Sequence, residues 1–239
     1  MSTLVLVRHA QATPFEADTD RLSPLGVRQA EALARHWAAV GTDLDEIHSG
    51  TLERQRRTAD VVAGVMLAGG RPWPPTAADS GFDEYDGDGV FGVLARELER
   101  RDARFRDLAG AARDARGTAE QNRHFQHMAE YVAQRWLRGE VTDPMVEAWP
   151  QFCDRVDAAI DKVLDAGGGR RVALFTSGGV IGRTLQRVLR APDETALALN
   201  WRIRNASLTQ LTFSGRSRVS LDTFNVTAHL HASDLDSFR

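Results

Sequence analysis

Hydrophobic positions in this chain alternate between two patterns, one typical of buried strands and one typical of helices. Residues 4–7 (LVLV) are a run of aliphatic side chains, as in a strand that is covered on both faces in a parallel sheet. Polar residues 14–24 with two prolines predict a loop. Ser23-Pro24 then begins a segment with apolar or alanine positions at helical spacing up to Val40, which Gly41 closes. The chain therefore opens with a strand, a loop and a helix.

The same alternation continues to the C-terminus. We expect a short strand at 44–49, a helix from 51 to about 67, a helix over 146–164, a strand from 171 leading through a glycine turn into a helix to about 190, and a hairpin at 206–213 and 218–226. Residues from about 90 to 140 are rich in arginine and alanine and predict helix throughout. This order predicts an α/β fold, a three-layer α/β/α sandwich with a mostly parallel central sheet and a helical insertion. We interpret residues 1–239 as a single domain in which about 90–140 form the insertion, a cap beside the site.

Composition limits the classes of protein that fit. With 239 residues, 42% of them hydrophobic, the chain can build one large domain with a core. Its net charge of -3 and its mixed charges argue against a nucleic-acid or membrane partner. Cys153 stands alone, which excludes an internal disulfide framework and a cluster of thiolates on zinc. No signal-like N-terminus or membrane-length apolar run is present, so we expect a cytoplasmic protein.

Unusual polar residues follow the predicted strands. Arg8 and His9 come after the first strand, Ser49 and Arg54 after the second, and residues 177–179 (SGG) after a later one. The carboxyl ends of parallel strands meet at one edge of the sheet, where ligands bind. A guanidinium can bind two oxygens of an anion, and an imidazole can attack it or move a proton. The alternative interpretation of the first pair is the polar end of a strand.

Four segments carry a resemblance to a known family. They are Arg8-His9-Ala10, similar to an Arg-His-Gly signature; residues 22–30 (LSPLGVRQA), similar to Leu-Thr-x-x-Gly-x-x-Gln-Ala; Ser49, Leu52, Arg54, Thr58 and Ala59, which match Ser-x-Leu-x-Arg-Ala-x-x-Thr-Ala with a shift of one residue; and the acidic loop 82–87 (FDEYDG). In this order the chain resembles the histidine phosphatase superfamily, the phosphoglycerate-mutase-like proteins, over nearly its whole length.

The resemblance implies a mechanism and roles for individual residues. His9 would be the nucleophile that attacks phosphorus to give a phosphohistidine, which water then hydrolyses. Arg8 and Arg54 would hold the phosphoryl oxygens. Glu84 would protonate the leaving oxygen, with Asp83 as the neighbouring candidate. No metal ion or other cofactor is implied. The alternatives are a solvated helix residue for Arg54 and one more exposed acid for Glu84.

One departure from the family pattern affects the expected activity. The family ends its late strand with Ser-His-Gly-Gly, whereas this chain has Thr176-Ser177-Gly178-Gly179. Ser177 can donate a hydrogen bond to phosphate but carries no charge, and the loss of one donor aimed at an oxyanion costs about 3 kcal/mol. Gly178 and the start of the following helix would still offer backbone N–H groups to phosphate.

Three functions follow as hypotheses. The first is a metal-independent phosphomonoester hydrolase that acts on a small phosphorylated molecule through a phosphohistidine at His9. The second is a catalytically weak or inactive protein with the same fold, which binds a phosphate ligand or has a regulatory role. The third is a phosphomutase, which must protect its phosphohistidine from water. Retention of His9 with Arg8 and Arg54 favours the enzyme, and Ser177 favours the second hypothesis. The apolar edge of the C-terminal hairpin is compatible with a homodimer. The sequence does not identify the substrate.

Overall fold

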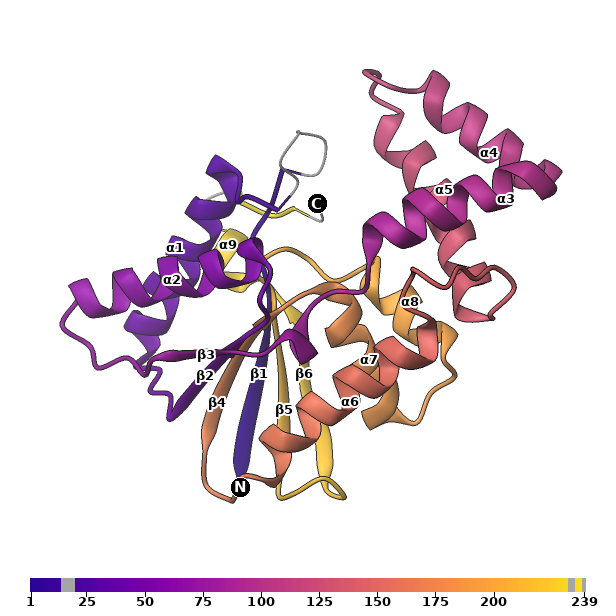
Figure 1. Ribbon diagram of the computed structural model, residues 1–239. Helices are drawn as coiled ribbons and strands as arrows, with labels where there is room; N and C mark the ends of the chain where they lie inside the picture. Colours follow the sequence, from indigo (N-terminus) through magenta and orange to yellow (C-terminus); the bar gives the residue numbers. More distant parts are fainter. Residues whose placement is uncertain (14–19, 232–234, 238–239) are drawn as a thin grey trace. The chain divides into compact units, whose positions relative to one another are not determined.

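The computed structural model describes residues 1–13, 20–231 and 235–237 (Figure 1). The chain divides into two compact units. The first consists of Met1–Glu84 with Arg155–Arg239, and the second is Tyr85–Asp154. Part of the loop predicted over 14–24, residues 14–19, lies outside the described residues.

The first unit is built on a mixed sheet. Its described strands are β1 (Ser2–Arg8), β2 (Glu46–Ser49), β3 (Thr76–Ala78), β4 (Arg171–Thr176), β5 (Leu208–Phe213) and β6 (Val219–Val226). They are ordered β3-β2-β4-β1-β5-β6. Strands β3, β2, β4 and β1 run parallel, β5 is antiparallel to β1, and β6 is antiparallel to β5. The predicted mostly parallel sheet is therefore confirmed.

Strand β1 lies at the centre of this sheet, between β4 and β5. Leu4 and Leu6 point to one face and are fully buried, while Val7 on the other face belongs to a core that also contains Phe175 of β4. Because both faces are covered, the strand has no solvent side, and its sequence is continuously aliphatic instead of alternating.

Helices cover both faces of the sheet (Figure 1). On one side lie α1 (Pro24–Val40), α2 (Glu53–Ala68) and α9 (Ala228–His231), and on the other lie the later part of α6 (Trp149–Asp165) and α7 (Gly178–Leu189), against which α8 (Glu194–Asn200) packs. This is the predicted three-layer arrangement. The predicted ends of α1 are also confirmed, since Ser23 Oγ accepts a hydrogen bond from the Gly26 N–H at 3.0 Å and Gly41 adopts φ 73°.

Four short elements of the described chain were not predicted: β3, α8, α9 and the 3₁₀ turn η1 (Ser80–Phe82). Strand β3 follows a proline-rich segment that predicts only a helix end, yet it pairs with β2 at the edge of the sheet, where proline in the approach does little harm. Helices α8 and α9 are too short for a clear periodic signal, and α8 is stabilised by burying Ala196 and Leu197. The helix predicted from 146 begins three residues later, at Trp149.

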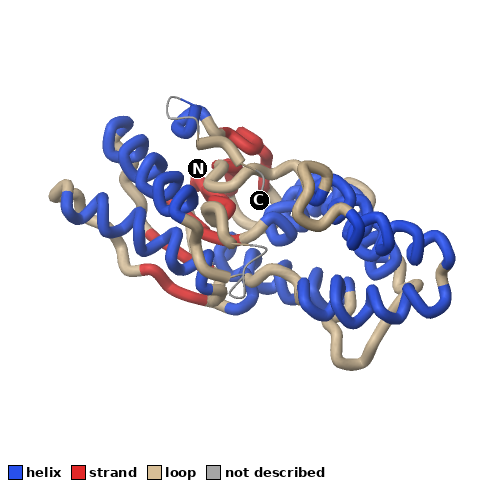
Figure 2. The backbone as a smooth tube through the Cα atoms, turned by 90° about the horizontal axis from the view of Figure 1, so that it is seen from above, coloured by secondary structure: helices blue, strands red, loops and turns tan. Residues whose placement is uncertain are grey.

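The second unit is helical. It contains a π-helical turn η2 (Gly89–Leu94), α3 (Ala95–Arg101), α4 (Ala103–Asp114), α5 (Gln121–Leu137) and the first residues of α6, while all strands in Figure 2 belong to the first unit. Aromatic rings form its core, with the rings of Tyr85 and Trp136 5.1 Å apart and those of Trp136 and Trp149 5.3 Å apart. The predicted helical insertion is confirmed, and its role as a cap within a single domain stays a prediction.

Candidate functional site

The predicted site residues of the first unit gather where three parallel strands end. Arg8 at the end of β1 is in register with Thr176 at the end of β4, and Ser49 at the end of β2 is in register with Phe175. The His9 N–H donates to the Thr176 carbonyl at 2.7 Å. Arg8, His9 and the start of α7 therefore lie along one edge of the sheet.

His9 has a defined tautomer. Its side chain is buried, with 7% of the residue exposed, and Nδ1 lies 2.8 Å from the Ala10 carbonyl oxygen. A carbonyl can only accept, so Nδ1 carries the proton and Nε2 keeps a lone pair. Burial, together with the charges of Arg54 and Arg8, holds the pKa of His9 well below its ordinary value. His9 is therefore a neutral imidazole at neutral pH, with Nε2 as its nucleophilic atom.

The backbone around His9 is fixed by side chains from α2 and the segment before β5. Ala10 N–H donates to Thr58 Oγ1 at 3.0 Å, and that hydroxyl donates to the Arg54 carbonyl at 2.6 Å. Asn205 Nδ2 donates to the His9 carbonyl at 3.2 Å. These contacts position the imidazole relative to Arg54. Thr58 enters the sequence motif, but the pattern gives no indication of this hydrogen-bonding role.

The two predicted arginines already bind oxygen acceptors. Arg8 Nη1 donates to the Ile203 carbonyl. Arg54, near the start of α2, has 20% of its side chain exposed and places Nη1 2.6 Å from Asp20 Oδ1. The Asp20 carboxylate also accepts from the Glu53 N–H at 2.7 Å and from the Arg54 N–H at 3.3 Å, as expected for an anion at a helix N-terminus. Arg54 is thus a partly buried anion-binding side chain and not a solvated helix residue.

The two candidate acids have different partners. Asp83 accepts from the Thr51 N–H at 2.5 Å and from Thr51 Oγ1 at 2.6 Å, so it stabilises the turn between β2 and α2. Glu84 is half-buried, and its Oε2 accepts from the Gly179 N–H at 3.0 Å, which places it at the start of α7. Of the two carboxyl groups, the geometry favours Glu84 as the one beside the turn at the start of α7, where the sequence predicts phosphate binding.

Ser177 and Gly178 begin α7 in a fully packed environment. Ser177 is fully buried, and its Oγ accepts a hydrogen bond from Gln55 Nε2 at 2.8 Å. A Cβ on Gly178 would lie 2.2 Å from Asn200 Oδ1, so a larger residue there would require the Asn200 side chain to move. Gln55 was missed by the sequence analysis. It lies within a polar run, residues 53–57 (ERQRR), that is typical of a solvent-exposed helix start.

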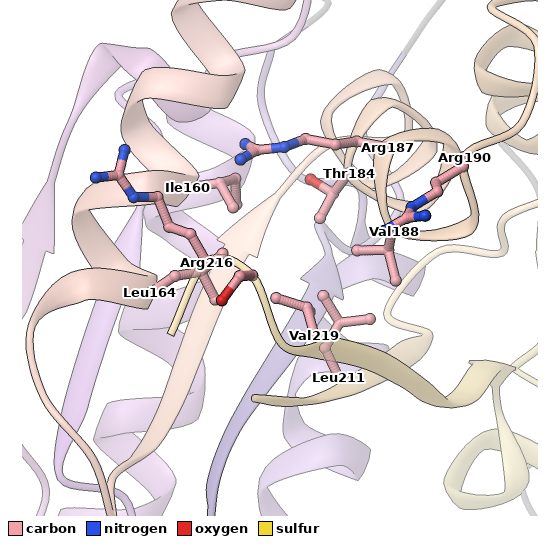
Figure 3. Close-up of a pocket in the computed structure, with 10 residues that line it drawn as sticks. Ile160, Leu164, Thr184, Arg187, Val188, Arg190, Leu211, Arg216 and Val219 are labelled. Atoms are coloured by element: carbon pink, nitrogen blue, oxygen red, sulfur yellow. The ribbon is translucent and has the colours of Figure 1, made fainter. Parts of the chain in front are cut away.

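A small cavity lies elsewhere in the first unit. Its volume is about 100 Å³, and it is lined by α6, α7, β5 and β6 (Figure 3). Arg187 and Arg216 on its rim pair with Asp161 and Asp165 at 2.6 Å and 2.9 Å. Phe213, which ends β5 near this cavity, is in register with Ser2 at the start of β1. The cavity is therefore at the amino end of β1, away from His9, and is smaller than common ligand pockets of about 300 Å³ or more.

Two kinds of feature are absent from the described part of the chain. No helix there is both long and apolar enough to cross a membrane. Residues 1–13, 20–231 and 235–237 contain no group of three or more His, Cys, Asp or Glu side chains arranged to hold a metal ion.

Comparisons with known proteins point to one family. The family model described as "Histidine phosphatase superfamily (branch 1)" matches residues 4–130 and 101–227. Three similar solved structures are Bacillus stearothermophilus YhfR (TM-score 0.68, 19% identity, covering 97% of this chain and 100% of that chain), a phosphoglycerate mutase from Bacillus anthracis (0.62, 17%, 96% and 95%) and a mycobacterial glucosyl-3-phosphoglycerate phosphatase with inorganic phosphate (0.61, 24%, 95% and 98%). At these identities the structures show a shared fold. A search of curated proteins found no matching sequence.

Proposed function

The chain belongs to the histidine phosphatase superfamily, and from this premise we propose that it hydrolyses a small phosphomonoester through a phosphohistidine at His9. Phosphoryl transfer is the chemistry that the similar phosphatase and mutase share by name. The observation that carries the proposal is the state of His9. Its Nδ1 is held by the Ala10 carbonyl at 2.8 Å, its pKa is lowered by burial and two arginines, and Nε2 is left as an uncharged nucleophile.

In the first step, Nε2 of His9 attacks phosphorus, an N–P bond forms, and the ester P–O bond breaks. Glu84 gives its proton to the leaving oxygen, so the alcohol departs neutral. In the second step, a water molecule attacks the phosphohistidine while the Glu84 carboxylate accepts a water proton. The N–P bond then breaks, inorganic phosphate is released, and both residues return to their starting states.

Charge on the transferred group is balanced by Arg8 and Arg54. The Arg54 guanidinium already holds a carboxylate, Asp20, at 2.6 Å, which supports a role in binding anions at this edge of the sheet. The same two arginines lower the pKa of His9. Burial is the first cause of this lowered pKa, and the same pair of cations that adds to it would bind the phosphoryl oxygens.

Release of phosphate from 4-nitrophenyl phosphate tests the proposal. We expect turnover in the presence of a chelator, loss of turnover in His9→Ala, and an acid-labile, base-stable phosphoprotein after rapid quenching. His127→Ala, which changes an exposed histidine of α5, is the matched control and should retain activity. A wild-type protein that is silent across pH with chelator and with added divalent metals would overturn the proposal, as would full activity in His9→Ala.

Ser177 favours a second candidate function, a protein that binds a phosphate ligand without turnover. The Ser177 hydroxyl is buried and uncharged, and its hydrogen-bond partner is the Gln55 amide nitrogen 2.8 Å away. At this position, therefore, the chain offers phosphate no positive charge. Calorimetric binding of inorganic phosphate with no product release would support this alternative. Phosphate transfer to an added alcohol, measured in the same reaction, would indicate a mutase.

A further inference from the structure

A buried glutamine connects three parts of the candidate site. The side chain of Gln55 in α2 is fully buried. Its Nε2 donates to Ser177 Oγ at 2.8 Å and to the Phe82 carbonyl at 3.1 Å, and its Oε1 accepts from the Leu52 N–H at 3.3 Å. Because a carbonyl only accepts and an N–H only donates, these two backbone partners fix which end of the amide is nitrogen.

The orientation of this amide determines what the serine can do. Nε2 of Gln55 can only donate, so Ser177 Oγ must be the acceptor in the bond between them. Among the described residues, the Ser177 side chain has no other hydrogen-bond partner, and its single hydroxyl proton therefore remains available. Ser177 directly follows Thr176, whose carbonyl accepts the His9 N–H at 2.7 Å. The available donor thus belongs to the residue that directly follows the backbone partner of His9.

The same glutamine also holds the loop that carries the acid. The Phe82 carbonyl accepts from Gln55 Nε2 and from Thr176 Oγ1, the latter at 2.7 Å. Phe82 is two residues before Glu84, whose carboxylate accepts from the Gly179 N–H at 3.0 Å. The amide therefore joins α2, the acid loop and the first turn of α7 in one buried network.

We propose that Gln55 is a positioning residue that keeps the Ser177 hydroxyl as a donor to a phosphoryl oxygen of the substrate. The Gln55 amide donates to a lone pair of the Ser177 oxygen, so the hydroxyl proton points away from the amide. This inference rests on the proposed phosphoryl-group site. It gives Ser177 a defined role that does not need a positive charge.

A double-mutant cycle tests the inference. The variants are Gln55→Met, which keeps a similar volume but removes the amide, Ser177→Ala, and the double variant; Gln55→Leu replaces the first if it does not fold. Gln186→Met is the matched control. Gln186 is also a largely buried glutamine in the same unit, and its Nε2 donates to the Ala191 carbonyl at 2.6 Å near the end of α7, away from the site.

Three quantities are measured for each protein: kcat and KM for 4-nitrophenyl phosphate, the Kd of inorganic phosphate by calorimetry, and the thermal unfolding temperature. We expect Gln55→Met and Ser177→Ala each to lower kcat by about a hundredfold, as for loss of one donor to a developing oxyanion. The double variant should be no slower than the slower single variant, because both changes remove the same donor. Gln186→Met should lower the unfolding temperature and leave kcat unchanged.

The opposite results are equally clear. If the two losses multiply in the double variant, Gln55 does not act through Ser177 and the inference is overturned. The same conclusion follows if Gln55→Met reduces kcat no more than Gln186→Met does. If the wild type binds phosphate without turnover, the proposed hydrolysis fails, and the cycle is run on the Kd values: non-additive losses then support the inference, and additive losses overturn it. A wild type that neither turns over nor binds phosphate overturns both.

Discussion

Lowering the pH from 7.5 to 5.5 should destabilise this protein through His9. The folded state keeps His9 neutral, because burial and the charges of Arg54 and Arg8 hold its pKa well below the ordinary value. In the unfolded chain the same imidazole titrates near its ordinary pKa of about 6.5. As pH falls through this value, the unfolded state takes up a proton that the folded state does not, and the free energy of unfolding decreases.

The magnitude follows from the difference in proton uptake. Between pH 7.5 and 5.5, the ratio of protonated to neutral imidazole in the unfolded chain rises from about 0.1 to about 10. Because the folded state keeps this imidazole neutral, the free energy of unfolding decreases by about 1.4 kcal/mol. The sign is fixed by the lowered pKa: stability is highest above about pH 6.5 and is lost as the solution becomes more acidic. Glu46, Asp79 and Asp102 also have lowered pKa values, but their stabilising effect is lost only in the more acidic range where carboxylates titrate.

Urea unfolding followed by tryptophan fluorescence at pH 5.5, 6.5 and 7.5 measures this effect. From pH 7.5 to 5.5, the free energy of unfolding should fall by about 1.4 kcal/mol more in the wild type than in His9→Gln, since the variant has no imidazole at this position to protonate. His127→Gln, which removes an exposed histidine of α5, is measured beside it as the matched control. An equal slope in the wild type and His9→Gln would refute the reasoning, because it would mean that folded His9 accepts a proton as readily as the unfolded chain.

Further predictions concern activity and packing. The lowered pKa of His9 predicts that kcat/KM stays on its plateau down to below pH 6.5, which a pH–rate profile checks. Glu84→Gln should lower kcat by about a hundredfold or more in the phosphate-release assay. Asp83→Asn should instead cost about 1 kcal/mol of stability in urea and leave kcat within a few-fold, because Asp83 stabilises a turn. Gly178→Ala should cost about 1–3 kcal/mol, read from thermal melting, since its Cβ would lie 2.2 Å from Asn200 Oδ1.

Elements with strong local signals could be predicted from the sequence. Strand β1 is aliphatic on both faces because it is central, and α1 has its own cap, first-turn proline and terminal glycine. Strand β3 and helix α8 lack such signals, since they are short and are stabilised by β2 and α7 respectively. The gathering of Arg8, His9 and Ser177 followed from strand direction alone, because parallel strands end at the same edge.

Side-chain partners within the site could not be predicted in this way. The neighbouring acids Asp83 and Glu84 are equivalent in sequence, and only their hydrogen bonds to Thr51 and to Gly179 separate them. Asp20 is one acid in a polar segment, and nothing local indicates that it binds Arg54 from 34 residues away. Each of these contacts depends on tertiary placement, which carries no periodic signal along the chain.

Ser177 shows how a local departure from a family pattern is interpreted differently once its neighbour is known. By itself, the serine is a missing charge. Next to Gln55, the serine hydroxyl is a suitable acceptor for the amide Nε2. A protonated histidine in place of Ser177 would put two hydrogen-bond donors against each other in a fully buried space. A neutral hydroxyl can be buried beside this amide, and under the inference above its proton is the one offered to phosphate.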